Sequence, residues 1–333
     1  MLKLISNELK KTLFRIRTYI SMVLIVIIAG SMALLPILLT DSSVSKSING
    51  DNWKQETFNH MEELEKNRQS ALKKIEEGND PESLEVMMHQ AEYNELSEEI
   101  EKLTYSIDHH IPPVSNNNLF NNLLSASQSS TLITILIIII AASILSDEYR
   151  YGTIKLLLIR PPSRIKILLS KLIAISIFIG LFMFLADIST LIVSLFVTDI
   201  NASLDYVFSG SDKEIQHANF LLLFASNLVA QFFTILIIAI LTFTLSTIIS
   251  STALVISLSL AIYFIADPVL LLLEQYSDIG NFLWFNYWKL NHFIAPYSQA
   301  DTSLLTAILV NSLYCLPLII VAFYGFKRKD ILS

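Results

Sequence analysis

Six stretches of this 333-residue chain are apolar enough and long enough to cross a lipid bilayer. A spanning helix needs about 20 mainly apolar residues, because its backbone rises by only about 1.5 Å per residue. Inside the bilayer the backbone amides must bond within their own segment, which favours helices. The sequence therefore predicts an all-α polytopic membrane protein with six transmembrane helices, at residues 19–40, 123–146, 171–197, 220–249, 253–273 and 304–326.

Composition excludes several other classes of protein. Charged residues make up 16% of the chain, whereas soluble domains have about 25%. The net charge of −7 gives no basic surface for nucleic acid. The single cysteine, Cys315, excludes internal disulfides and a thiolate metal cluster. The eight glycines form neither a P-loop nor a dinucleotide fingerprint, so any nucleotide must be bound by another polypeptide.

The distribution of basic residues predicts the orientation of the spans. Of the 23 lysines and arginines, 14 lie in the N-terminal segment, between spans two and three, or in the C-terminal tail. Positive residues in short loops mark the cytoplasmic side. We therefore expect a multi-pass protein of a bacterial plasma membrane with both termini in the cytoplasm, where segments 1–18, 147–170 and 327–333 would lie. Leu2–Arg17 has an apolar stripe typical of an interfacial helix, and otherwise is only the basic flank of span one.

The region 41–122 would lie outside the cell, and it carries 17 acids and 7 bases. Gly78–Pro81 is a turn by composition and separates two amphipathic segments. Their apolar residues recur at alternating spacings of three and four, the pattern of packed helices. We expect an extracellular antiparallel helical hairpin standing off the membrane. Its stripes are Met61, Leu64, Arg68, Ala71 and Ile75 in one helix, and Tyr93, Leu96, Ile100, Leu103 and Ile107 in the other.

Two further outer loops are predicted, at 198–219 and 274–303. The second is rich in aromatic residues, and Trp284 and Trp288 would share a face if it were helical. One interpretation is an aromatic belt at the outer membrane interface. The other is a short re-entrant helix pair that caps a transport pathway.

The cytoplasmic loop at 147–170 has a definite pattern. Span two ends at two acids, and Gly152 breaks the helix. Thr153 can cap a short apolar helix that ends at Pro161-Pro162, and Ser163 can cap the next helix. Such a helix suits docking into a groove on a soluble partner. The alternative is an interfacial loop that only satisfies the positive-inside rule.

This loop resembles that of ABC-2 type transporter permeases. The resemblance extends to the six spans, the amphipathic N-terminal helix and the aromatic loop before span six. The region 41–122 departs from many members, which have a short loop there, and is similar to Gram-positive permeases with an enlarged first outer loop, including exporters of peptides and antibiotics. The matching loop residues are Glu148, Gly152-Thr153-x-Lys155-Leu156-Leu157-Leu158, Arg160-Pro161-x-Ser163-Arg164-x-Lys166 and Ser170-Lys171.

The resemblance implies a role for each part of the loop. Glu148 and Gly152 would form the bend after span two, and Thr153–Ile159, with Lys155, would be the coupling helix. Arg160, Pro161 and Arg164 would set its exit and contact the ATPase or lipid headgroups. Two separate ATPase subunits and a second permease, identical or related, would be the partners. The chain itself would be no enzyme, would need no cofactor, and would export an amphipathic peptide, antibiotic or lipid-like molecule.

Polar residues inside the spans are the candidates for a substrate pathway, because a charge at the bilayer centre costs about 2.5–3.5 kcal/mol. Asp187, Asn227 and Gln231 are the main ones, together with Trp284 and Trp288 in the aromatic loop. The alternative is that they bond across helices or lie near the outer interface, which we favour for both Asp187 and Asp267. The adjacent pair His109-His110 has no third ligand nearby, so no metal site is expected.

A different class of function also fits these features. A membrane sensor or immunity protein would use the outer hairpin as a receptor for an extracellular peptide and would transport nothing. An exporter needs the loop at 147–170 to bind an ATPase, and a sensor or immunity protein does not. An intramembrane enzyme is disfavoured, since the spans carry no histidine and no H-E-x-x-H motif.

Overall fold

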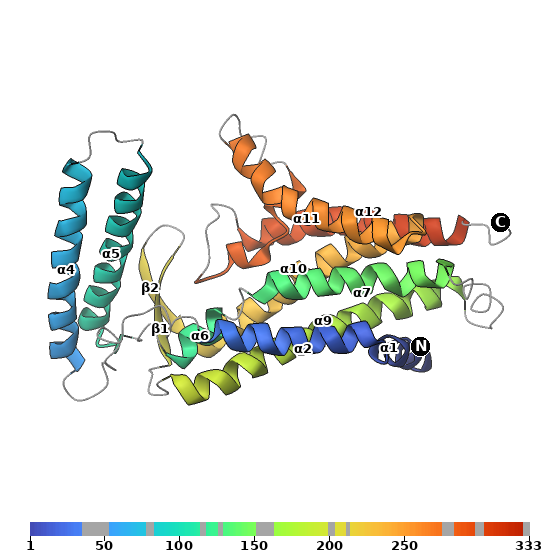
Figure 1. Ribbon diagram of the computed structural model, residues 1–333, viewed down its shortest axis with the longest axis horizontal. Helices are drawn as coiled ribbons and strands as arrows, with labels where there is room; N and C mark the ends of the chain where they lie inside the picture. Colours follow the sequence, from blue (N-terminus) through green and yellow to red (C-terminus); the bar gives the residue numbers. More distant parts are fainter. Residues whose placement is uncertain are drawn as a thin grey trace.

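The computed structural model describes residues 1–34, 53–77, 83–113, 118–125, 129–150, 163–198, 204–210, 214–274, 283–296 and 303–328. Helices dominate these residues, with one small sheet (Figure 1). The elements in chain order are α1 (Leu2–Leu13), α2 (Ile16–Met32), α4 (Trp53–Glu77), α5 (Leu84–Asp108), α6 (Leu119–Ser125), α7 (Ser130–Arg150), α9 (Arg164–Val197), β1 (Asp205–Ser209), β2 (Ile215–Asn219), α10 (Phe220–Ile248), α11 (Thr252–Glu274), η3 (Trp284–Asn286), η4 (Leu290–Phe293) and α12 (Leu304–Arg328).

Five of the described helices, α7, α9, α10, α11 and α12, are long and apolar enough to cross a membrane. The pair α1 and α2 is bent by 75° at its junction and gives a sixth candidate if it is counted as one span. The protein is therefore an all-α polytopic membrane protein, as the hydropathy pattern predicts. The expected first span at 19–40 corresponds to α2 up to Met32, and its last residues lie outside the described ranges.

The spanning helices form a bundle in which α10 packs against α7, α9, α11 and α12, while α2 lies along α9 (Figure 1). The core lies between α7, α9 and α10, where Ile137, Phe178 and Ile235 are fully buried. By contrast, about half of the apolar side chains of α11 and α12 are exposed, and few are buried. In a membrane these exposed faces contact lipid or another protein.

The bundle has two distinct ends (Figure 1). Helix α1 and the last turns of α12 lie at one end, which we call the terminal end. The pair α4–α5, the sheet and α6 lie at the other, which we call the hairpin end. An even number of crossings is what brings both chain ends to one side of a bundle.

Helices α4 and α5 pack side by side and run antiparallel. His60 near the start of α4 meets Glu99 near the end of α5, with 3.8 Å between imidazole and carboxylate. A hydrogen bond to Glu99 raises the pKa of His60 above 6.5. The residues of both expected stripes are buried or half-buried, while most of the flanking positions are exposed. The pair lies across the end of the bundle (Figure 1).

A small sheet explains this crosswise position. Strands β1 and β2 pair antiparallel, with Val207 opposite His217, in the stretch predicted as a plain loop. The Tyr105 hydroxyl of α5 lies 2.9 Å from His217 Nδ1, and both strands contact α5. The C-terminal half of α5 is thus held sideways against the connection between α9 and α10.

The second span differs from the prediction at both ends. The described helix is α7, from 130 to 150, instead of 123–146, and α6 is a separate short helix. Asn122 of α6 is buried and donates hydrogen bonds to Ala33 O and Ser194 Oγ, so α6 covers the ends of α2 and α9. At the other end α7 continues past the two acids, which lie within its last turns.

Candidate functional site

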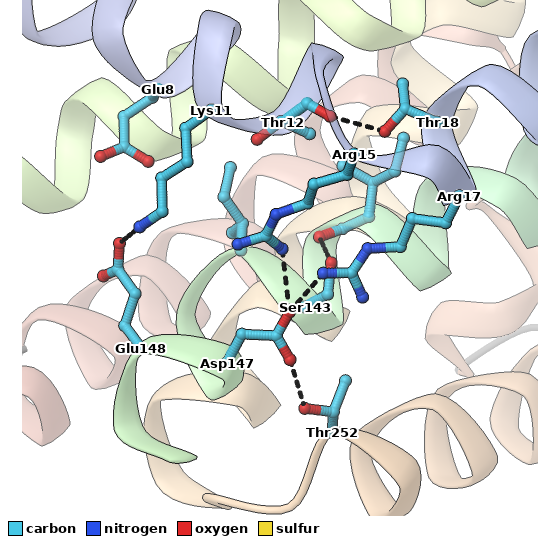
Figure 2. Close-up of polar contacts among 12 residues, drawn as sticks. Glu8, Lys11, Thr12, Arg15, Arg17, Thr18, Ser143, Asp147, Glu148 and Thr252 are labelled. Carbon is cyan, nitrogen blue, oxygen red and sulfur yellow. Dashed lines mark hydrogen bonds and ion pairs between the residues drawn. The ribbon is translucent and has the colours of Figure 1, made fainter. Parts of the chain in front are cut away.

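At the terminal end, a buried lysine joins three helices. Lys171 of α9 is fully buried, although its position at the start of a span predicts a membrane anchor. Its Nζ lies 2.8 Å from Glu8 Oε2 of α1 and 2.8 Å from Glu148 Oε1 of α7. The Glu148 carboxylate also accepts a hydrogen bond from Lys11 of α1 (Figure 2). Glu148 Oε2 is buried and has no hydrogen-bond partner among the described residues.

The neighbouring acid, Asp147, connects α7 to two other elements (Figure 2). Arg15 Nη1 donates to Asp147 Oδ2 over 2.8 Å, and Arg17 donates to the same oxygen. The other oxygen, Oδ1, accepts a hydrogen bond of 3.1 Å from Thr252 Oγ1 at the start of α11. Asp147 therefore links the bend between α1 and α2 to the first turn of α11.

Together these side chains form what we call the charged cluster. Burying an ion costs several kcal/mol unless it is paired, and each acid here is paired with at least one base from another helix. The cluster contains three acids and four bases, and its geometry fixes α1, α2, α9 and α11 around the end of α7. Its members are Glu8, Lys11, Arg15, Arg17, Asp147, Glu148, Lys171 and Thr252.

The local sequence of α1 explains how it reaches the cluster. Glu8 and Thr12 lie one turn apart and are its two buried residues, while Leu9 and Leu13 are half-buried against the core. Thr18 Oγ1 of α2 donates to Thr12 O over 2.7 Å, which closes the bend between the helices. The apolar stripe we predicted is thus only partly inside the protein, and polar residues make the innermost contacts.

Sequence reasoning identified only part of this site. Glu148 was a predicted coupling residue and lies at its centre, and Arg164 is exposed at the first position of α9. Glu8 and Thr252 were missed, although Glu8 is the sole acid within Leu2–Arg17, and Lys171 was predicted only as part of the loop motif and as a membrane anchor. Ser163 precedes α9 as expected, but its side chain makes no capping hydrogen bond. The predicted residues Gly152, Thr153, Lys155, Arg160 and Pro161 lie outside the described ranges.

A groove of about 530 Å³ opens beside the start of α9 at the same end. It is mainly apolar and flanks the C-terminal boundary of the predicted coupling segment. Its lining comes from Ser163, Arg164 and Ile165, and from Ile320, Phe323, Tyr324 and Phe326 of α12.

Toward the hairpin end, three of the predicted pathway residues share one small cavity. Asp187 of α9 and Asn227 and Gln231 of α10 line a space of about 10 Å³, together with Leu123, Leu124, Phe224 and Leu228. Asn227 and Gln231 are buried, and Asp187 is half-buried. The structure thus brings together residues that lie about 40 positions apart in the chain.

The predicted tryptophans do not line this cavity. Trp288 is buried against Tyr263 and Phe285, and Trp284 Nε1 donates to Asn311 Oδ1 of α12 over 2.8 Å. Residues 283–296 fold back and pack between α10, α11 and α12. The aromatic belt and the re-entrant helix pair both stay predictions.

The position of residues 283–296 along α10 shows how far this segment reaches into the bundle. Leu290 N donates to Thr234 Oγ1 over 3.0 Å, and Thr234 lies 14 residues beyond Phe220, or about 21 Å along the helix. Backbone that is not helical is tolerated at such depth where protein surrounds it. Asp267, just before Pro268 in α11, pairs at 2.5 Å with Lys289 of this segment, as expected for a residue that bonds to its surroundings.

Comparison with known proteins places this architecture in a family. The family model described as "Protein of unknown function (DUF2705)" matches residues 85–332, which is most of the chain. The chain belongs to the DUF2705 family. The matched region of this DUF2705 protein runs from α5 to α12. It includes the cavity and the cluster residues Asp147, Glu148, Lys171 and Thr252. The other cluster residues precede it: Glu8, Lys11, Arg15 and Arg17.

The DUF2705 protein is also similar over its whole length to a curated relative. The "Uncharacterized protein YhcI" of Bacillus subtilis (strain 168) is 25% identical over 335 residues, which covers 99% of each chain. Within the described residues, no group of three His, Cys, Asp or Glu side chains is placed to hold a metal ion.

Proposed function

We propose that this chain is the permease subunit of an ABC-2 type exporter. A separate ATPase would bind the cytoplasmic loop at 147–170, and ATP hydrolysis there would move the spans to export an amphipathic substrate. The observation that carries the proposal is the charged cluster, which joins the two helices flanking that loop to α1, α2 and α11.

A coupling device needs a stiff connection between the loop and the spans. Glu148 lies two residues before the end of α7, and Lys171 lies seven residues after the start of α9. Their ion pair ties the two sides of the loop together, and Glu8 extends the connection to α1. A force applied to the loop by a partner would therefore move α7, α9 and α1 together, because breaking a buried ion pair costs about 3–5 kcal/mol.

The partners in this proposal are inferred from the missing phosphate-binding motif and from the exposed apolar faces of α11 and α12. The chain has no phosphate-binding motif, so the ATPase is a different polypeptide. The apolar faces of α11 and α12 suit a second permease, identical or related, or membrane lipid. With two permeases we expect two ATPase subunits. The basic residues at the terminal end support a cytoplasmic position for this end in the plasma membrane.

Co-purification tests the proposal directly. The tagged chain is isolated in mild detergent from its native host, and co-purifying proteins are identified by mass spectrometry. We expect a P-loop ATPase with the wild type and a large loss of it with Lys155→Glu and with Gly152→Pro. Lys10→Glu is the matched control, because Lys10 is basic, is exposed on α1 at the same end of the bundle and lies outside the loop.

An absence of any ATPase, together with loop variants that behave like the wild type, would contradict the proposal. The alternative of a membrane sensor or immunity protein would then be the hypothesis to test. In that case α4 and α5 become the elements to mutate, with retention of an extracellular peptide as the readout.

A further inference from the structure

The cavity between α6, α9 and α10 contains polar groups that the protein itself leaves unsatisfied. The Asp187 carboxylate and the Gln231 amide form no hydrogen bond or ion pair with any described residue, although both line the cavity. The Asn227 Oδ1 atom is buried and likewise lacks a partner. Leaving one such group buried costs about 1–3 kcal/mol, and more when the group is charged.

The Nδ2 atom of Asn227 fixes the orientation of the side-chain amide. Its Nδ2 donates to Leu223 O over 2.9 Å and to Ala295 O over 2.7 Å. These bonds identify Nδ2 as the donor and leave the oxygen as the free group of the amide. The cavity is therefore supplied with oxygen ligands from a carboxylate and an amide, and the Gln231 side chain can turn its own oxygen toward them.

Asp187 also differs from Asp267 of α11. Asp267 pairs with Lys289, so its charge is compensated within the protein. No lysine, arginine or histidine lines the cavity around Asp187, which is its sole titratable lining residue. A carboxylate in a membrane span is stabilised by a compensating positive charge or is neutralised by a proton.

We propose that Asp187, Asn227 and Gln231 form a binding site for one small monovalent cation of the size of Na⁺. One carboxylate balances one positive charge, which favours a monovalent over a divalent ion. A space of about 10 Å³ holds a single water-sized particle, which excludes organic cations. Carboxylate and amide oxygens are the ligands that hard cations prefer.

Binding at this position would strengthen the hairpin end of the bundle. The cation would join α9 to α10, and through Asn227 and Ala295 it would also hold the segment 283–296. The site lies near α6, far from the charged cluster at the opposite end of the bundle (Figure 1), and it requires no ATPase. It can therefore exist whether or not the chain is a permease.

The experiment uses the purified full-length chain in detergent. Thermal unfolding is measured in NaCl and in choline chloride at equal ionic strength and constant pH, and ²²Na⁺ binding is measured by equilibrium dialysis. We expect Na⁺ to raise the melting temperature saturably and to bind at one ion per chain. Asp187→Asn should weaken Na⁺ binding by about 100-fold, because it removes the negative charge without changing shape.

Two further variants keep the test decisive. Asp267→Asn is the matched control and should bind Na⁺ like the wild type, since Asp267 lies outside the cavity. Gln231→Leu removes one oxygen ligand without touching a charge, and should weaken binding even if Asp187→Asn fails to fold. Equal melting in both salts with no bound ²²Na⁺ would overturn the proposal, as would Na⁺ binding that survives both cavity variants. Melting in choline chloride is also measured at a lower pH. If the lower pH stabilises the protein and Na⁺ does not, the cavity binds a proton, which would also overturn the proposal.

Discussion

At the scale of the residue, the least expected feature is that Lys171 is buried between two glutamates. A lysine near the start of a span ordinarily extends toward the headgroups, where its charge is hydrated. Here its side chain is 0% exposed, and its two partners come from two other helices, α1 and α7. The charge that should anchor a helix to the membrane surface instead joins helices to one another.

Lys171→Met should destabilise the protein strongly, because it leaves Glu8 and Glu148 buried with fewer counter-charges. We expect a loss of about 3–5 kcal/mol, seen as a lower midpoint of thermal unfolding in detergent. The double variant with Glu148→Gln should recover part of the loss. Lys166→Met, on the exposed side of the same helix, is the control. If both single variants melt alike, the ion pairs contribute no net stability.

At the scale of the element, the segment 283–296 depends on one side chain of α12. Asn311 accepts a hydrogen bond from Trp284 Nε1 and donates to Tyr287 O and to Ala307 O. The segment has only two short 3-10 turns of its own, so most of its polar backbone needs partners from the surrounding helices. This explains how irregular backbone can lie deep within a bundle of apolar helices.

Asn311→Leu should release this segment. It removes hydrogen bonds to Trp284 and Tyr287, at a cost of about 2–4 kcal/mol. In a Trp53→Phe background the remaining tryptophans are Trp284 and Trp288, so their fluorescence reports on the segment alone. We expect stronger acrylamide quenching than in the wild type. Ser312→Ala, at the exposed neighbouring position, should leave quenching unchanged, and equal quenching in both variants would contradict the role of Asn311.

At the scale of the whole molecule, the two ends of the bundle differ in character. The terminal end gathers buried ion pairs and the start of α9, whereas the hairpin end carries α4, α5, the sheet and α6 (Figure 1). The distribution of basic residues predicts that the terminal end faces the cytoplasm. The orientation is therefore a property that one labelling experiment can test.

Single cysteines provide that experiment, because Cys315 is the chain's one native cysteine and is replaced first by alanine. A membrane-impermeant maleimide should label Gln90→Cys on α5 in intact cells. Lys10→Cys on α1 is equally exposed in the structure, and should react only after the cells are opened. Labelling of Lys10→Cys in intact cells would contradict the predicted orientation.

The sequence alone determined the class of the protein, most of the spans and the stripes of α4 and α5. These properties are local, because hydropathy over about 20 residues and spacings of three and four are read along a single helix. It did not reveal the sheet, since β1 and β2 are five residues each and carry little periodic signal. Nor did it separate α6 from α7, because their apolar residues follow closely in the chain.

Only the tertiary structure decided how the functional candidates are grouped. Glu8 and Lys171 are 163 residues apart, and their contact depends on which faces of α1 and α9 meet. Asp187, Asn227 and Gln231 were visible as polar residues in spans, but only the packing of α9 on α10 places them around one cavity. Helix rotation and pairing come from side-chain packing across the whole bundle, and no local pattern records them.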